Sequence, residues 1–150
     1  IANLMAHDTY GPHQRIVFGR KSLPELDGVP EAEWAGDHIR LIHSLFPNVS
    51  ISGILGDYCL VSQLYPGPTV ETTRTIQTVL ARRLPETDEE RATADKFSSM
   101  ALQAVRDEDY WVGFQIQQAL KSGATPDLLF GRNEPTLQHF HRSVERYAER

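Results

Sequence analysis

The sequence has a single cysteine, Cys59, among its 150 residues. One cysteine excludes an internal disulfide and any cluster site that is built on paired cysteines. No apolar run approaches the roughly 18 residues of a transmembrane helix. Residues 1–20 interrupt any candidate signal-peptide core with charged side chains and histidines. We therefore expect a cytoplasmic protein in a reducing compartment.

An excess of basic residues is also missing. Fifteen Lys and Arg stand against 20 Asp and Glu, which gives a formal net charge of −5. This balance argues against binding to nucleic acid or to a membrane surface. The sequence also has no glycine-rich phosphate loop, nucleophile elbow or His-Glu-x-x-His motif. Its length and its 40% hydrophobic content suit one compact domain. Because the chain opens with Ile1 and not with Met, we expect residues 1–150 to be an incomplete fragment of a longer protein.

The first half of the sequence predicts strands. Short apolar or alternating runs are separated by turn-forming residues such as Gly11-Pro12 and Pro47-Asn48. The segment 23–36 reads as a loop or a short irregular helix. The expected strands are residues 14–18, 38–46, 49–54, 58–65 and 69–80. We expect them to form an antiparallel meander, with one face of the last strand in water.

The second half switches to a helical period. Thr87 and Glu90 form a capping box that begins a helix, and Ser122-Gly123 ends it. A helix of about 35 residues is long for a globular domain, so we expect a kink, and Gly113 is the obvious place. The apolar stripe of this helix is Phe97, Ala101, Val105, Val112, Ile116 and Leu120. A final helix follows Pro135, with a stripe of Leu137, Phe140, Val144 and Tyr147. Strands followed by helices predict an α+β fold, with a long helix across an antiparallel sheet.

One residue breaks the pattern of the long helix. Asp109 falls on the apolar stripe, four residues after Val105 and seven before Ile116, beside Asp107 and Glu108. A buried carboxylate is costly unless it is paired, hydrogen-bonded or bound to a cation. Two interpretations stay open on spacing alone: a structural acid that pairs with arginine or lies in solvent, and a metal carboxylate that faces a cavity.

The histidines give a weaker signal. His43 shares a predicted strand face with Leu41 and Leu45, so it is either a hydrogen-bonded core histidine or a pocket residue that contacts substrate. His7 and His13 have the spacing of neither a helical nor a strand pair. His139 and His141 point in opposite directions on a helix, so they cannot hold one ion together.

The segment from Val105 to the end of the chain resembles the large (alpha) subunits of Rieske-type aromatic-ring-hydroxylating oxygenases. The matching pattern is Glu108-Asp109, then Gln117, Leu120 and Ser122-Gly123. Phe130 to Glu134, followed by Leu137 and His139 to His141, resembles the closing helix of that family. Upstream, Gly11-Pro12-His13, Leu45 to Asn48 and Pro66 to Pro68 fall in the expected order, so the resemblance covers nearly the whole chain.

The resemblance implies a helix-grip (START/Bet v1-like) fold and a mononuclear Fe(II) that is held by two histidines and one carboxylate. Asp109 matches the carboxylate, and His43 would line the substrate cavity. The resemblance implies that the two iron histidines are five residues apart and follow a segment with Asn or Asp, and we expect no such pair among the six histidines of this chain. We expect that pair and the Rieske [2Fe–2S] domain upstream of Ile1. Residues 1–150 would then be the C-terminal portion of the mononuclear-iron catalytic domain, and this fragment alone would be inactive.

The resemblance also implies the chemistry and the partners. Electrons would pass from a reductase, often through a ferredoxin, to the Rieske cluster and then to the iron, where O2 is activated to hydroxylate an aromatic or related small organic substrate. The longer protein would be a homo-oligomer, as the trimers of this family are. The alternative from another class is an iron-free helix-grip domain that binds a hydrophobic small molecule. The alternative gives no reason for an acid at position 109.

Overall fold

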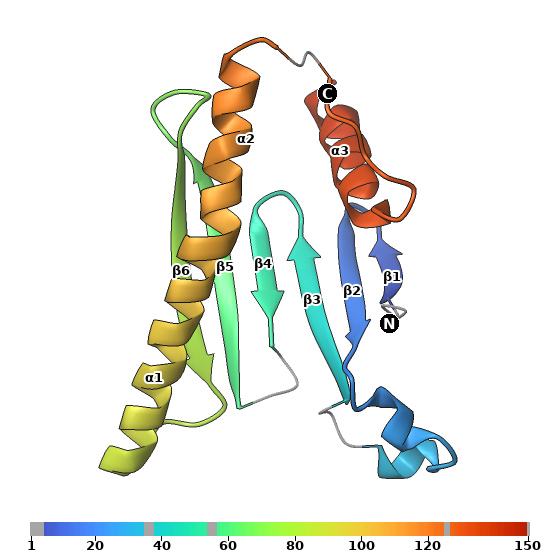
Figure 1. The fold of residues 1–150 in the computed structure, drawn as a ribbon, viewed down its shortest axis with the longest axis vertical. Coiled ribbons are helices and arrows are strands. Elements are labelled where there is room, and N and C mark those ends of the chain that lie inside the picture. Colours follow the sequence, from blue (N-terminus) through green and yellow to red (C-terminus); the bar gives the residue numbers. More distant parts are fainter. Residues whose placement is uncertain (1–4, 35–37, 54–56, 125–126, 150) are drawn as a thin grey trace.

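The fold is α+β in the computed structural model, which describes residues 5–34, 38–53, 57–124 and 127–149. Six strands are followed by helices along the chain (Figure 1). The strands are Met5–Tyr10 (β1), His13–Gly19 (β2), Ile39–Leu45 (β3), Val49–Ser52 (β4), Tyr58–Pro66 (β5) and Thr73–Ala81 (β6). They form one antiparallel sheet in sequence order, β1-β2-β3-β4-β5-β6. The predicted meander is therefore confirmed.

Two details of the strands differ from the prediction. β1 was not predicted, and it pairs with β2 across the turn at Gly11-Pro12. The last strand begins at Thr73 and not at residue 69. Residues 69–72 form a turn that Thr72 closes, because its Oγ1 donates to the Thr69 carbonyl oxygen at 3.0 Å and accepts from the Thr69 amide at 3.2 Å. The last residue of the predicted 49–54 strand lies outside the described residues.

The segment between β2 and β3 contains two short 3-10 helices, Leu23–Leu26 and Glu31–Glu33. They agree with the short irregular helix or loop that the sequence predicted there. After the sheet come the helices Asp88–Ala104 (α1), Trp111–Lys121 (α2) and Pro135–Ala148 (α3). The capping box at the start of α1 is confirmed, since Thr87 Oγ1 accepts from the Glu90 amide and the Glu90 side chain accepts from the Thr87 amide. No helix of the described residues is long and apolar enough to cross a membrane.

A π-helical segment, Val105–Tyr110, joins α1 to α2 and makes one long helix of them. The predicted kink at Gly113 is therefore misplaced, because the irregular turn lies earlier and Gly113 is a regular residue of α2. Neither proline nor glycine lies in the π segment, so the usual sequence signals for a distorted helix are missing. A π turn is wider than an α turn, and the apolar stripe of α1 does not continue in phase along α2.

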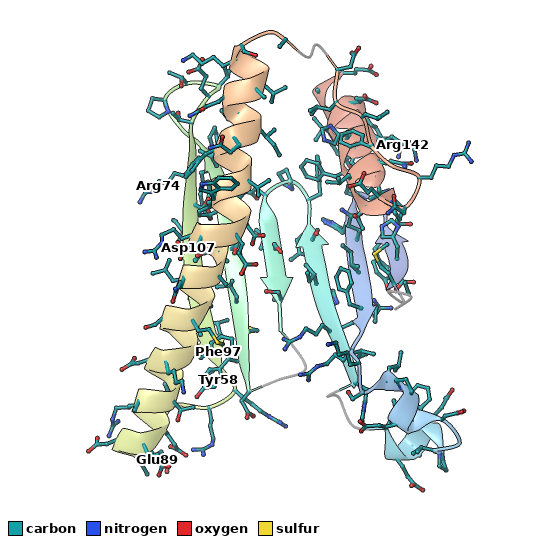
Figure 2. The ribbon with its side chains drawn as sticks, in the orientation of Figure 1. Tyr58, Arg74, Glu89, Phe97, Asp107 and Arg142 are labelled. Atoms are coloured by element: carbon teal, nitrogen blue, oxygen red, sulfur yellow. The ribbon has the colours of Figure 1, made fainter. Side chains whose placement is uncertain are left out.

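All helices lie on one face of the sheet, which we call the inner face. The ring of Tyr58 in β5 stacks on Phe97 of α1, with centroids 4.9 Å apart (Figure 2). At the other end, the side chain of Gln14 in β2 donates to the Thr136 carbonyl oxygen of α3 at 3.2 Å. Figure 1 shows the α1–α2 helix in front of β5 and β6 and α3 at the upper ends of β1 and β2, whereas no helix lies in front of β3 and β4.

The packing between these layers is open. Among the described residues, no apolar side chain is fully buried, and the buried polar residues are Gln14 and Ser143. The last helix also turns a different side to the sheet than its apolar stripe predicted. Ser143 is buried, whereas Leu137, Val144 and Tyr147 are exposed. The half-buried residues of this helix are Pro135, Thr136, Gln138, His139, Phe140 and His141. Phe140 and Tyr147 nevertheless both contact Phe46 after β3.

Candidate functional site

Asp109 lies in the π-helical segment, near the middle of the long helix. Its side chain is exposed, and both interpretations from the sequence, a structural acid in solvent and a metal ligand, stay open. Val112 and Ile116 of the predicted apolar stripe are exposed as well, so a place on that stripe does not bury a side chain in this helix. Single π turns inside α-helices occur frequently at functional sites. The position of Asp109 therefore draws attention for its backbone geometry instead of its burial.

The three neighbouring carboxylates differ in their partners. Arg106 donates to Asp107 from Nε at 2.6 Å and from Nη2 at 3.2 Å, and this hydrogen bonding lowers the pKa of the Asp107 carboxyl below its ordinary value. Within the described part of the chain, the side chains of Glu108 and Asp109 form no hydrogen bond or ion pair. Asp107 is thus engaged locally, while the Asp109 carboxylate keeps its oxygen atoms available to a ligand.

The strand register assigns each sheet residue to the inner or the outer face, since cross-strand partners share a face. Inner positions of β3 and β4 are Arg40, Ile42, Ser44, Ser50 and Ser52. The neighbouring inner positions of β5 and β6 include Leu60, Ser62 and Gln77, and Gln77 Nε2 lies 3.4 Å from Ser62 Oγ. The inner face therefore combines apolar side chains with small hydroxyl groups, a lining that suits a small organic molecule with a few polar atoms.

His43 lies on the outer face, opposite Arg15 and Ile51 in the neighbouring strands. Its Nδ1 is buried and has no hydrogen-bond partner. A pocket role for His43 stays a prediction, and such a pocket would lie on the side of the sheet that faces away from the long helix. Ile42 and Ser44, which flank His43 in the sequence, lie on the inner face instead. The alternation of a strand separates its two faces but does not tell which of them the helices cover.

His38 and His43 have the five-residue spacing of the family's iron pair, which the sequence-based assignment overlooked. The structure gives them different surroundings: Nδ1 of His38 lies 2.9 Å from the Ser22 carbonyl oxygen, while His43 is within β3. Positions five apart on an extended chain point to opposite faces. No group of three or more His, Cys, Asp or Glu residues converges within the described ranges in a way that could hold a metal ion. Asp109 is not joined there by a second ligand.

The sequence analysis also missed a polar contact between β1, β2 and α3, which His7, Gln14 and His139 form. His7 Nε2 lies 2.9 Å from Gln14 Oε1, and the rings of His7 and His139 meet edge to face at 6.0 Å between centroids. His139 Nε2 is buried without a hydrogen-bond partner. His141 turns elsewhere and packs on Phe130 at 4.5 Å, as the opposite directions of the two α3 histidines predicted. No signal in the sequence indicated this contact, because His7 lies in β1 and that strand was not predicted.

Comparison with known proteins identifies a family. The family model described as ring hydroxylating alpha subunit (catalytic domain) matches residues 2–150. No curated protein and no solved structure matches the chain significantly. The match covers almost the whole chain, including the π segment with Asp109.

Proposed function

The chain belongs to the family of ring hydroxylating alpha subunits (catalytic domain), and on that premise we propose that it forms the C-terminal part of the iron-containing catalytic domain of a Rieske oxygenase. The longer protein, which we call the parent, would activate O2 to hydroxylate an aromatic or related small organic substrate. The observation that carries this proposal is the unpaired carboxylate of Asp109 on the π turn. The coarser conclusion, an oxidoreductase of the ring-hydroxylating class, follows from family membership.

Asp109 fits one ligand position of a mononuclear non-haem iron. Its carboxylate is an anionic, hard oxygen donor of the kind that completes a site with two histidines, and no described residue competes for it. When bound, the iron would supply the redox chemistry with O2. We place the two histidine ligands and the Rieske [2Fe–2S] cluster in the parent outside residues 1–150, as the family resemblance implies.

The residues of this chain have two tasks in the proposal. Asp109 holds the metal from the side of the long helix. The inner face of β3, β4 and β5 forms a wall for the substrate, where apolar side chains such as Ile42 and Leu60 contact its ring and the serine hydroxyls accept or donate single hydrogen bonds. The engaged Asp107 keeps Arg106 away from Asp109. Positioning, not acid–base catalysis, is therefore the contribution of this part of the domain.

The partners of the parent follow from the same family. They are an aromatic substrate, O2 and electron-transfer proteins, for which we propose a reductase that acts directly or through a ferredoxin. We also propose a homo-oligomer, a trimer in the first instance, in the cytoplasm.

The experiment that tests the proposal compares Asp109→Ala with Asp107→Ala in the parent. Asp107 is the matched control, because it is an aspartate two residues away that the structure pairs with Arg106. We expect Asp109→Ala to keep the Rieske absorbance but to lose mononuclear iron, with substrate-dependent O2 uptake lowered at least 100-fold. We expect Asp107→Ala to retain both.

Two outcomes would contradict the proposal. If Asp109→Ala retains iron and turnover, Asp109 is not a ligand. If the wild-type parent holds neither a Rieske cluster nor iron and still binds apolar molecules, the iron-free helix-grip binding domain is the better description. Iron content by elemental analysis, the Rieske spectrum and oxygen-electrode rates separate these cases.

A further inference from the structure

We propose that Arg40 recognises an anionic group of the substrate, so that the preferred substrate class is an aromatic carboxylic acid. This inference rests on the proposed function, because it takes the inner face of the sheet as the substrate wall. Arg40 lies in β3 on that face, where its cross-strand partner is Phe18 in β2. Its side chain is exposed.

Arg40 is the only Asp, Glu, Lys or Arg on the inner face of the six strands. The charged strand residues Asp8, Arg15 and Arg74 all lie on the outer face. Apart from the imidazole of His7, the rest of the inner face is apolar, hydroxyl-bearing or amide-bearing. A single fixed cation on a wall without anions sets up a field that favours one negative charge on whatever molecule lies against it.

The guanidinium of Arg40 also lacks a partner among the described residues. Among the residues that the structure describes, Arg40 takes part in no ion pair and no side-chain hydrogen bond, whereas Arg15, Arg83, Arg91 and Arg106 each contact a carboxylate. Unpaired guanidinium groups present five donors in a planar fork that matches a carboxylate bidentately. The guanidinium donors of Arg40 are therefore available to bind the carboxylate of a ligand.

The neighbours of Arg40 suit the rest of such a molecule. Arg40 and Phe18 line a hollow of about 510 Å³, together with Arg20, Lys21 and Ser22 from the turn after β2. The positive side chains at this end add to the attraction for an anion, and the phenyl ring of Phe18 offers an aromatic contact beside the guanidinium. An aromatic ring that carries a carboxylate satisfies both features, whereas a neutral hydrocarbon uses only the ring.

The first test measures binding, which does not depend on iron or turnover. 4-Fluorobenzoate and its neutral counterpart 4-fluorobenzamide are titrated with the parent and followed by 19F NMR. We expect the acid to bind at least tenfold more tightly than the amide, since a charge-assisted hydrogen-bonded pair is worth on the order of tenfold or more. Arg40→Gln should abolish that preference, and Arg40→Lys should retain part of it because the charge remains while the planar fork is lost.

Arg74→Gln is the matched control. Arg74 is an exposed arginine in a strand, it lies on the outer face, and no described residue pairs with it (labelled in Figure 2). Its removal changes the net charge by the same amount and should leave the preference for the acid intact. A loss of the preference in both variants would show that only the overall charge matters, and it would overturn the proposal.

Further outcomes separate this inference from the proposed function. Equal binding of acid and amide, or an unchanged preference in Arg40→Gln, would overturn the role of Arg40. Displacement of 4-fluorobenzoate by acetate or phosphate as readily as by benzoate would show a general anion site and overturn the aromatic part. If the parent oxygenates neutral aromatics in an Asp109-dependent manner and ignores the acids, the oxygenase stands and this inference fails. If the acids bind through Arg40 but no iron or oxygenation is found, the proposed function fails.

Discussion

The two halves of the long helix differ in how they relate to the sheet. α1 begins with a complete capping box and lays Phe97 on Tyr58 of β5. α2 exposes most of its large apolar side chains, among them Trp111 at 61% and Phe114 at 65%. Its one ion pair to the β5–β6 connection is Lys121 Nζ to Glu71 Oε2 at 2.9 Å. The π segment with Asp109 lies between α1, which packs on the sheet, and α2, whose apolar side chains are mostly exposed.

The contacts that anchor the helix therefore lie in α1, whereas Asp109, the iron ligand that we propose, lies outside α1. Local rules of capping and packing are met in α1, and they hold the helix against the sheet. The π segment breaks the regular α-helical hydrogen bonding, and the exposed carboxylate of Asp109 lies within it. If the division is correct, substitutions in α1 should change stability without changing iron content, and the reverse should hold for Asp109.

The largest stability effect is expected for Phe97→Ala. The substitution removes the stacked ring that joins α1 to β5, and for a half-buried phenylalanine we expect a loss of about 2 kcal/mol in the free energy of unfolding. Urea denaturation of the parent measures this loss. Met100→Ala is the control, because Met100 is 59% exposed on the same helix and should cost less than about 0.5 kcal/mol. Equal effects of the two would contradict the anchoring role of α1.

Removal of the helix cap should have the next largest effect. Thr87→Ala deletes the hydroxyl that accepts from the Glu90 amide, and we expect a loss of about 1 kcal/mol. Thr87→Ser keeps the hydroxyl and should retain most of the stability. Iron content should be unchanged in both variants; a loss of iron from Thr87→Ala would show that the cap and the π segment are coupled, against the division proposed above.

Gly113→Ala tests where the helix is irregular. An added methyl group would meet no atom within 4 Å, and the residue is helical. Alanine should therefore raise the free energy of unfolding by about 0.5–1 kcal/mol. Thermal denaturation of the parent provides the measurement. A destabilised variant would instead identify Gly113 as the hinge that the sequence predicted.

The smallest expected effect is a loss of stability at low pH that depends on Glu90. Hydrogen bonds from Arg83, and then from the Glu86 and Thr87 amides, lower the pKa of Glu90 from 4.5 to about 2. Because the folded value lies below the unfolded one, the contribution of Glu90 is present above pH 4.5 and is lost as the pH falls toward 2. The Glu90 side chain is 32% exposed and its ion pair with Arg83 is reached by solvent, so the effect is modest. We expect wild type to lose more stability than Glu90→Gln across this window in acid denaturation followed by circular dichroism; parallel curves would speak against the shifted pKa.

Much of the fold could be read from the sequence, for reasons that specific residues illustrate. The alternation through β6 and the capping box at Thr87 are short-range patterns, and both appear where they were predicted within a few residues. β1 was missed because its six residues, Met5 to Tyr10, carry no alternation of apolar and polar side chains. These residues form a strand because they pair with β2, and a pattern of residues along the chain does not reveal such a pairing.

The candidate site could be read only in part. The resemblance singled out Asp109, and the structure adds that Asp107 is engaged by Arg106 while Asp109 is not. The sequence placed Asp109 on the apolar stripe of the long helix, but Val112 and Ile116 of that stripe are exposed, as Asp109 is. Arg40 drew no attention in the sequence, since an exposed arginine on a strand is ordinary until its face and its missing partner are known.

The sequence by itself determined the α+β order of elements, the start of α1 and the end of α2, because each depends on residues that are near one another along the chain, and its motifs in their order indicated the family. Only the tertiary structure decided which strand face lies under the helices, that His38 and His43 diverge, and which carboxylate and which guanidinium lack a partner. Those properties depend on neighbours across space. A period of two or 3.6 residues defines the faces of an element, but packing decides which face is covered.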